Sequence, residues 1–139
     1  MLDVRLENGL PAIDGDEVEL QQLVLNLCLN ARDAMPNGGR LILETRPLSD
    51  TQARRLAEDG SVAEGVSIIV RDTGAGMPPE VIERIFEPFF TTKHEGNKGA
   101  GLGLAMVYGI VRRHGGAIDV KSRVGMGTAF EILLPAAGA

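Results

Sequence analysis

Apolar and polar positions follow two different periods along this chain, and these periods predict an alternation of strands and helices. Residues 2–6 alternate apolar with charged side chains, which predicts a half-buried first strand. Apolar positions spaced three and four apart predict a long helix over residues 16–35, with Asp16 as its cap and the turn at residues 36–39 as its end. Such a helix would be about 30 Å long.

Shorter elements fill the rest of the chain. Ser49 and Gln52 have the spacing of a capping box before a short charged helix, so residues 47–65 are interpreted as a peripheral insertion that covers a sheet edge. The prolines at residues 78–79 open another short helix, and a further helix is predicted over residues 102–114. Runs typical of strands occupy residues 40–46, 66–71, 117–121 and 128–134.

The overall composition suits one compact domain over residues 1–139. The longest nearly unbroken apolar run, residues 23–29, is far shorter than the about 20 residues that a membrane span needs, and no leader precedes it. A net charge of −5 gives no overall field that would attract nucleic acid. The single Cys28 cannot form an internal disulfide and is expected to be a small core residue. We therefore expect a cytoplasmic domain without nucleic-acid or membrane contacts, although a parent protein could be membrane-anchored.

A polar stripe divides the long helix. At 100° per residue, Gln22, Asn26, Asn30 and Asp33 fall within an arc of roughly 80°, apart from a broad apolar face. A buried amide without a partner costs about 1 to 3 kcal/mol, so the two asparagines need a ligand, water or protein contact. The side-chain oxygen of Asn30 suits Mg²⁺, which prefers oxygen ligands shared with substrate phosphates. Hydrogen bonds to neighbouring backbone are the alternative interpretation.

A second candidate site element follows the predicted strand at residues 66–71. This strand places Asp72 at its end, and Gly74 and Gly76 then allow a sharp turn or close approach of a ligand. A buried aspartate needs a donor, and the amino group of adenine would supply one. The alternative is an ordinary turn in which the Asp72 side chain bonds to its own backbone.

Spaced glycines form the third element. Gly99, Gly101 and Gly103 allow backbone amides to face phosphate at a helix start, and Lys93 and Lys98 supply charge in the polar loop before them. An ordinary surface loop is the alternative. A dinucleotide-binding fold is set aside, because these glycines do not follow the first strand of a βαβ unit.

Together these motifs resemble the catalytic and ATP-binding domain of sensor histidine kinases, in the GHKL superfamily that also contains gyrase, Hsp90 and MutL. The resemblance covers nearly the whole chain. It implies an α/β two-layer sandwich of the Bergerat type, with a mixed sheet covered on one face by helices and a flexible ATP lid. The matching segments, in order, are residues 26–31, 72–76, 86–90, 99–104 and 125–128.

The same resemblance implies roles for individual residues. Asn30 would hold Mg²⁺, Asn26 would assist at the phosphates, Asp72 would bind adenine with support from Thr128, and Lys93 would act with the glycines of the lid. Asn26 and Lys93 are the expected catalytic residues. The full set expected to contact ATP is Asn26, Asn30, Asp33, Asp72, Gly74, Gly76, Lys93, Gly99, Gly101, Leu102, Gly103, Leu104 and Thr128.

Asn26 favours a kinase over an ATPase. By the resemblance, ATP-hydrolysing relatives generally carry Glu at this position, where a carboxylate can activate water, and an amide cannot accept a proton at neutral pH. Neither His94 nor His114 resembles a phosphoacceptor, and both are interpreted as surface or capping residues, since histidine also suits the dipole at a helix C-terminus. The substrate histidine is therefore expected on a separate dimerisation domain, with a response regulator downstream. A degenerate nucleotide-binding module and a free-standing ATPase are the alternatives.

The aromatic segment at residues 86–90 has two open interpretations. It holds three of the chain's five aromatic residues, which either fill the core or present a surface to the histidine-bearing domain. Met77 is expected to pack nearby rather than to mark a cofactor site.

Overall fold

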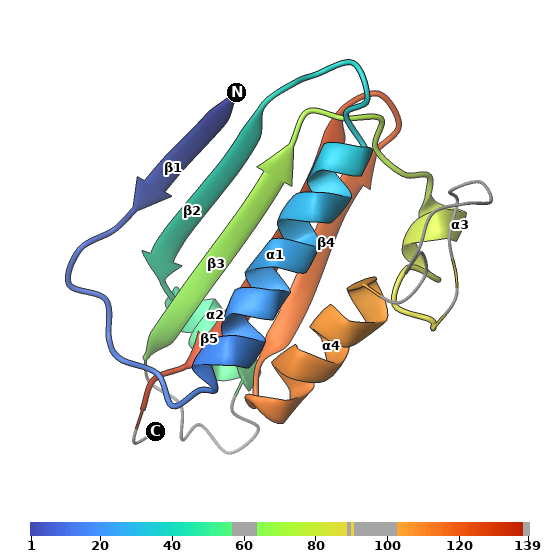
Figure 1. Cartoon of the computed structure of the whole chain (residues 1–139). Coiled ribbons are helices and arrows are strands. Elements are labelled where there is room, and N and C mark those ends of the chain that lie inside the picture. Colours follow the sequence, from blue (N-terminus) through green and yellow to red (C-terminus); the bar gives the residue numbers. More distant parts are fainter. Residues whose placement is uncertain (57–63, 89, 91–102, 138–139) are drawn as a thin grey trace.

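One mixed sheet forms the centre of the computed structural model, which describes residues 1–56, 64–88, 90 and 103–137. Its strands are β1 (Leu2–Leu6), β2 (Leu41–Pro47), β3 (Gly65–Asp72), β4 (Ala117–Arg123) and β5 (Gly127–Pro135). They lie side by side in the order β1-β2-β3-β5-β4 (Figure 1). β1 runs parallel to β2, and the other neighbouring pairs are antiparallel. The predicted strands are thus confirmed, with ends that differ by one or two residues.

Helices cover this sheet mainly on one side. The helices of the described residues are α1 (Glu17–Asp33), α2 (Asp50–Leu56), α3 (Pro79–Ile82) and α4 (Gly103–Arg113). α1 and α4 lie against the same face of the sheet, and the short α2 lies behind it (Figure 1). The predicted α/β sandwich, with a mixed sheet and a helical layer, is confirmed.

The core lies between the sheet and the pair α1 and α4. Leu23 and Leu27 of α1, Val107 of α4, and Phe130 and Ile132 of β5 are each at most 1% exposed and belong to one buried cluster. Alternation along β5 points every second side chain into this cluster, and helical spacing does the same along α1. The apolar periods of the sequence therefore correspond to this one interface.

Local capping explains where α1 and α2 begin. The Asp16 side chain accepts a hydrogen bond from Glu19 N at 3.0 Å. At α2, Ser49 Oγ accepts from Gln52 N at 3.2 Å, and Gln52 Oε1 accepts from Ser49 N at 3.0 Å. Both predicted caps are therefore confirmed, and the second is a complete capping box.

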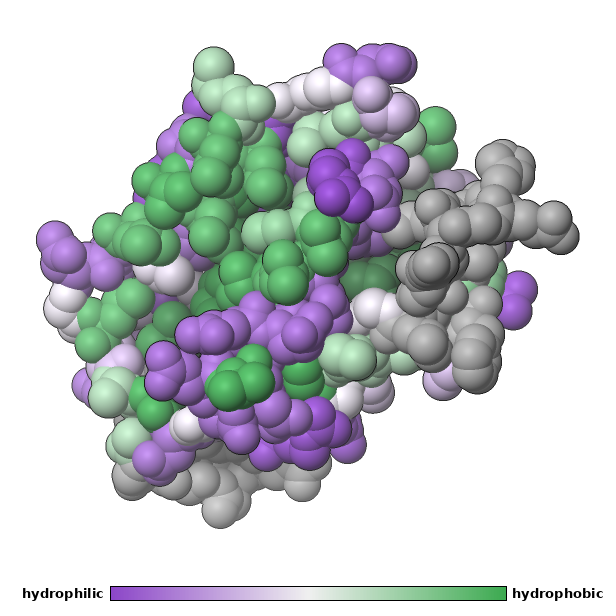
Figure 2. Space-filling view, viewed as in Figure 1, coloured by the Kyte–Doolittle hydropathy of each residue, from purple (hydrophilic) through white to green (hydrophobic). Residues whose placement is uncertain are grey.

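β1 departs from the sequence expectation. Its apolar residues were predicted to be half-buried, but Leu2, Val4 and Leu6 are 63%, 49% and 62% exposed. The reason is position: β1 is an edge strand, and no described helix lies over it (Figure 1). Apolar side chains are correspondingly visible on the side of the molecule where β1 lies (Figure 2).

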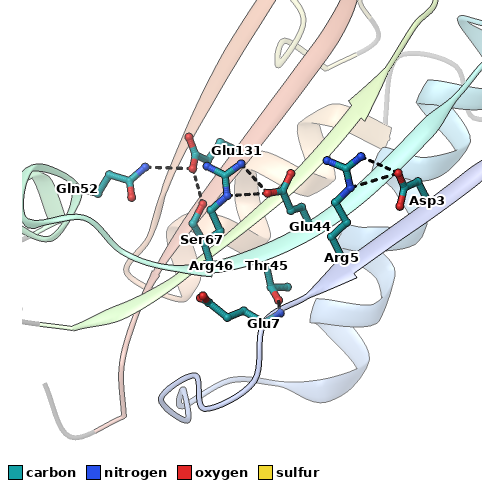
Figure 3. A network of polar contacts seen from close by, with 9 residues as sticks. All are labelled: Asp3, Arg5, Glu7, Glu44, Thr45, Arg46, Gln52, Ser67 and Glu131. Carbon is teal, nitrogen blue, oxygen red and sulfur yellow. Dashed lines mark hydrogen bonds and ion pairs between the residues drawn. The ribbon is translucent and has the colours of Figure 1, made fainter.

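The face of the sheet opposite α1 and α4 carries a polar network (Figure 3). Gln52 of α2 donates to Glu131 of β5 at 3.1 Å, and Ser67 of β3 donates to the same carboxylate at 2.5 Å. Glu44 pairs with Arg46 through an Nε–Oε2 contact of 2.7 Å. The predicted insertion at residues 47–65 thus places α2 against the sheet face rather than over a sheet edge.

Candidate nucleotide site

Asp72 ends β3 as a buried carboxylate. It is 4% exposed, and its Oδ1 accepts hydrogen bonds from Gly74 N at 2.8 Å and Thr128 N at 3.3 Å. Burial raises the pKa of the Asp72 carboxyl, and the two backbone donors partly oppose that rise. In the described part of the chain no hydrogen bond involves Oδ2, so this oxygen is left to accept from a ligand.

The local turn at Asp72 is observed, and it is compatible with the ligand interpretation. The bond from Gly74 N is the local turn that was the alternative to a ligand site, and it occupies only Oδ1. A second donor, Thr128 N of β5, bonds to the same oxygen. The two bonds together fix the orientation of the carboxylate. A preoriented acceptor with one free oxygen can select a donor on a ligand.

The turn after Asp72 is fastened to the end of α1. Ala75 N donates to Ala34 O at 3.1 Å. A Cβ at Gly74 would lie 2.4 Å from the same carbonyl oxygen, and a Cβ at Gly76, which has φ +71°, would lie 1.8 Å from Arg123 O. Gly74 and Gly76 are thus required by close backbone approaches. These contacts bring the aspartate turn next to the helix that carries the asparagines.

The two asparagines of α1 differ in their contacts. Asn26 Oδ1 accepts from Gln22 Nε2 at 2.8 Å, and Asn26 Nδ2 donates to Gly103 O and Met106 Sδ, both at 3.4 Å. Asn26 therefore satisfies its amide through protein contacts with the start of α4. Asn30 is half-buried, and within the described residues its side chain has no hydrogen bond. Its amide remains available to a ligand.

The amino-acid sequence that builds this site matches a known family. Residues 15–138 match the family described as histidine kinase-, DNA gyrase B-, and HSP90-like ATPase. The chain belongs to this family. Together with the relatives and solved structures that follow, this match confirms the Bergerat-type fold and the resemblance to sensor histidine kinases.

Individual relatives place the ATPase domain among sensor kinases. The chain is 47% identical over 137 residues to the sensor kinase CckA of Brucella abortus, covering 96% of this chain and 14% of that protein. It is 42% identical over 126 residues to the sensor histidine kinase ZraS of Salmonella typhi, covering 91% of this chain and 24% of that protein. The chain thus spans less than a quarter of the length of these curated relatives.

Solved structures agree in fold. The mycobacterial sensor histidine kinase MprB superposes with a TM-score of 0.74 at 30% identity, over 97% of this chain and 80% of that one. Full-length ShkA, solved in complex with AMPPNP, superposes with a TM-score of 0.73 at 31% identity, over 99% of this chain and 26% of that one. A nucleotide analogue therefore occupies a structural neighbour of this ATPase domain.

Other predicted residues of the ATPase domain are placed as follows. Asp33 is exposed and pairs with the Arg32 guanidinium at 3.2 Å. Gly103 opens α4, and Leu104 packs against the core cluster. Four predicted residues lie outside the described part of the chain, namely Lys93, Gly99, Gly101 and Leu102.

The aromatic segment has a packing role in the described residues. Phe86 and Phe90 are partly buried against the core cluster, and the Phe86 ring lies 5.5 Å from that of Tyr108. Met77 packs against the same cluster, as expected. The contacts favour the core-filling interpretation for Phe86 and Phe90, while Phe89 lies outside the described residues.

An apolar groove elsewhere on the domain is separate from this site. It has a volume of about 720 Å³ and is lined on α1 by residues that include Leu20, Val24 and Cys28. At 100° per residue these positions point away from the polar stripe of Asn26 and Asn30. Burial raises the pKa of the Cys28 thiol, which also packs against the core, as predicted for a small core residue.

No helix in the described ranges is sufficiently long and apolar to span a bilayer. Those ranges also lack a group of three or more His, Cys, Asp or Glu side chains able to hold a metal ion.

Sequence reasoning missed two site residues. Ser122 of β4 accepts a hydrogen bond from Met77 N at 2.8 Å and contacts Thr128 Oγ1 at 2.8 Å, and Met106 of α4 contacts the Asn26 amide. A serine in a strand and a methionine on a helix carry no local signal. Only the contact between distant segments identifies them.

Proposed function

We propose that this chain is the catalytic and ATP-binding domain, over residues 1–139, of a two-component sensor histidine kinase. It binds Mg-ATP and transfers the γ-phosphoryl group to a histidine on a separate dimerisation domain. The observation that carries the proposal is Asp72, a buried carboxylate with one oxygen held by two backbone donors and the other left free.

Adenine recognition follows from this carboxylate. Asp72 Oδ2 is an acceptor and the adenine amino group is a donor, so the pair satisfies the one carboxylate oxygen to which no described residue donates. Thr128 supports the site because its backbone N–H orients the carboxylate. The nucleotide complex of ShkA, a structural neighbour, supports a nucleotide as the ligand.

Asn30 is the residue that would hold Mg²⁺. Its half-buried amide has no hydrogen bond within the described residues, and an amide oxygen is a ligand type that Mg²⁺ accepts. Bound there, Mg²⁺ would neutralise phosphate charge. In the proposal Lys93 and the glycines at 99, 101 and 103 contact the phosphates from the lid.

Asn26 determines what the site does with the bound phosphate. Its amide is held between Gln22 and the start of α4, and it cannot remove a proton from water. A histidine from a partner domain supplies its own nucleophilic nitrogen and needs mainly positioning. The N–P bond forms as the β–γ bridging P–O bond breaks, ADP leaves, and the imidazole proton passes to solvent.

The acceptor histidine is proposed to lie outside this domain. Both ring nitrogens of His114 are engaged: Nδ1 lies 2.7 Å from Ile110 O, and Nε2 accepts from Asp16 N at 3.0 Å. A ring with both nitrogens occupied offers no free nucleophile, whereas His94 lies outside the residues that the structure describes. The proposed partners are a histidine-bearing helical domain and, after it, a response regulator that receives the phosphoryl group, with the domain itself in the cytoplasm.

Calorimetric titration with ATP and ADP, with and without Mg²⁺, tests the proposal first. Binding of both nucleotides is expected, and no heat or displacement at millimolar nucleotide would reject it. Adding a histidine-bearing partner domain should then give an acid-labile phosphoprotein. Binding without phosphotransfer would indicate a regulatory module, and steady phosphate release by the chain alone would indicate an ATPase.

A further inference from the structure

The turn that carries Asp72 is held from outside by the hairpin that joins β4 to β5. Gly125 N donates to Ala75 O at 2.6 Å. Gly127 has φ +84°, and a Cβ there would lie 2.1 Å from Asp72 O. The hairpin backbone thus packs directly on the base-recognition turn, residues 72–77, without side chains between them.

One hydroxyl lies at the centre of this contact. Ser122 Oγ accepts from Met77 N at 2.8 Å, donates to Gly127 O at 3.0 Å, and lies 2.8 Å from Thr128 Oγ1. Gly127 O can only accept, so it takes the single proton of Ser122. Met77 N–H can only donate. The remaining contact must then be a hydrogen bond in which Thr128 Oγ1 donates to Ser122 Oγ.

This assignment has a chemical consequence for the site. Thr128 is 5% exposed, and its proton is directed to Ser122, so the Thr128 oxygen can offer only lone pairs to anything else nearby. Its backbone N–H binds Asp72 Oδ1, which places this residue beside the carboxylate. The free groups of Asp72 and Thr128 are therefore both acceptors.

We propose that Ser122 is a positioning residue that sets base selectivity, by holding the turn at residues 72–77 and by fixing Thr128 Oγ1 as an acceptor. Two acceptors favour a purine with an amino group at C6, which is a donor, over one with an oxygen there. This inference rests on the proposed function, since it assumes that a nucleoside triphosphate binds at Asp72. Ser122 itself touches no substrate and acts through its neighbours.

The test compares ATP with inosine triphosphate, which carries oxygen in place of the amino group at C6. Wild type should prefer ATP, and Ser122→Ala should reduce the ratio of the two affinities by about tenfold, the equivalent of one ordinary hydrogen bond. Ser122→Thr keeps the hydroxyl and should restore the ratio. Ser67→Ala is the matched control, because that hydroxyl binds Glu131 on the other face of the sheet.

A second variant keeps the test decisive if Ser122→Ala does not fold. Thr128→Val removes the hydroxyl that Ser122 orients, and it should also lower the ratio. If wild type binds neither nucleotide, the proposed function fails. If wild type prefers ATP, two results would overturn the inference alone. One is an unchanged ratio of ATP to inosine triphosphate affinity in Ser122→Ala or Thr128→Val. The other is an equal drop of this ratio in Ser67→Ala.

Discussion

At the scale of single residues, the ionised Asp72 side chain lowers the stability of the fold and provides the acceptor proposed to bind adenine. Burial raises the pKa of its carboxyl above the ordinary 3.8, so the native state holds this proton more tightly than the unfolded chain does. The stability it contributes is fully present below that ordinary value and is lost as pH rises through the raised folded pKa. The ionised group therefore lowers the free energy of unfolding at neutral pH, where it would bind adenine.

Asp72→Asn should consequently separate the two properties. The amide oxygen can still accept from Gly74 N and Thr128 N, so the free energy of unfolding at pH 7 should equal or exceed that of wild type. ATP affinity should fall by about 10- to 100-fold, because an amide NH₂ would face the adenine amino group. Urea unfolding at several pH values and calorimetric titration measure the two effects.

Asp119→Asn is the matched control for this change. Asp119 pairs with Arg55 on the face of the sheet that carries α2. Its substitution should leave ATP affinity unchanged. Unaltered nucleotide binding in Asp72→Asn, or equal losses in both variants, would refute the role of Asp72.

Asn30 permits a prediction about metal removal. If its amide holds Mg²⁺, Asn30→Ala should lose about tenfold in ATP affinity with Mg²⁺ present and little with EDTA present. Asn37→Ala changes the same side chain in the exposed turn after α1 and should alter neither value. Equal losses with and without Mg²⁺ would assign Asn30 to the nucleotide rather than to the metal.

At the scale of elements, His114 joins the start of α1 to the end of α4. Its Nε2 accepts from Asp16 N at 3.0 Å, and its Nδ1 lies 2.7 Å from Ile110 O in the last turn of α4. The contact with Ile110 O agrees with the predicted capping role. The contact with Asp16 N adds a link to α1 that the sequence did not indicate.

His114→Ala should therefore loosen the pairing of these helices. We expect the free energy of unfolding to fall by about 1 kcal/mol, because the substitution removes the acceptor of Asp16 N and one of the two groups that contact Ile110 O. Arg112→Ala, an exposed position in the last turn of α4, should cost less than half as much. Chemical denaturation compares the two, and equal losses would show that the His114 bonds contribute nothing specific.

Elements were predicted well where their signal is local. The cap at Asp16, the capping box at Ser49, and the apolar periods of α1 and β5 depend on neighbours within four residues, which the sequence displays directly. The exposure of β1 was missed for the opposite reason. Burial of an alternating strand depends on whether a helix lies above it, and strand Leu2–Leu6 lies at an edge that α1 does not cover.

At the scale of the whole molecule, the candidate site depends on chain segments far apart in sequence. Asp72 was visible as the aspartate before a glycine turn, and Asn30 as part of a polar stripe. Their shared location became predictable only through the family resemblance. Ser122 was not predictable in either way, because its meaning comes from contacts with Met77 and Thr128 that the sheet order creates.

The most direct test of the account is a crystal structure of this chain with Mg²⁺ and a non-hydrolysable ATP analogue. We expect the adenine amino group within hydrogen-bond distance of Asp72 Oδ2 and the metal bound by the side-chain oxygen of Asn30. A structure with Asp72 turned to solvent and Asn30 remote from both metal and nucleotide would contradict it.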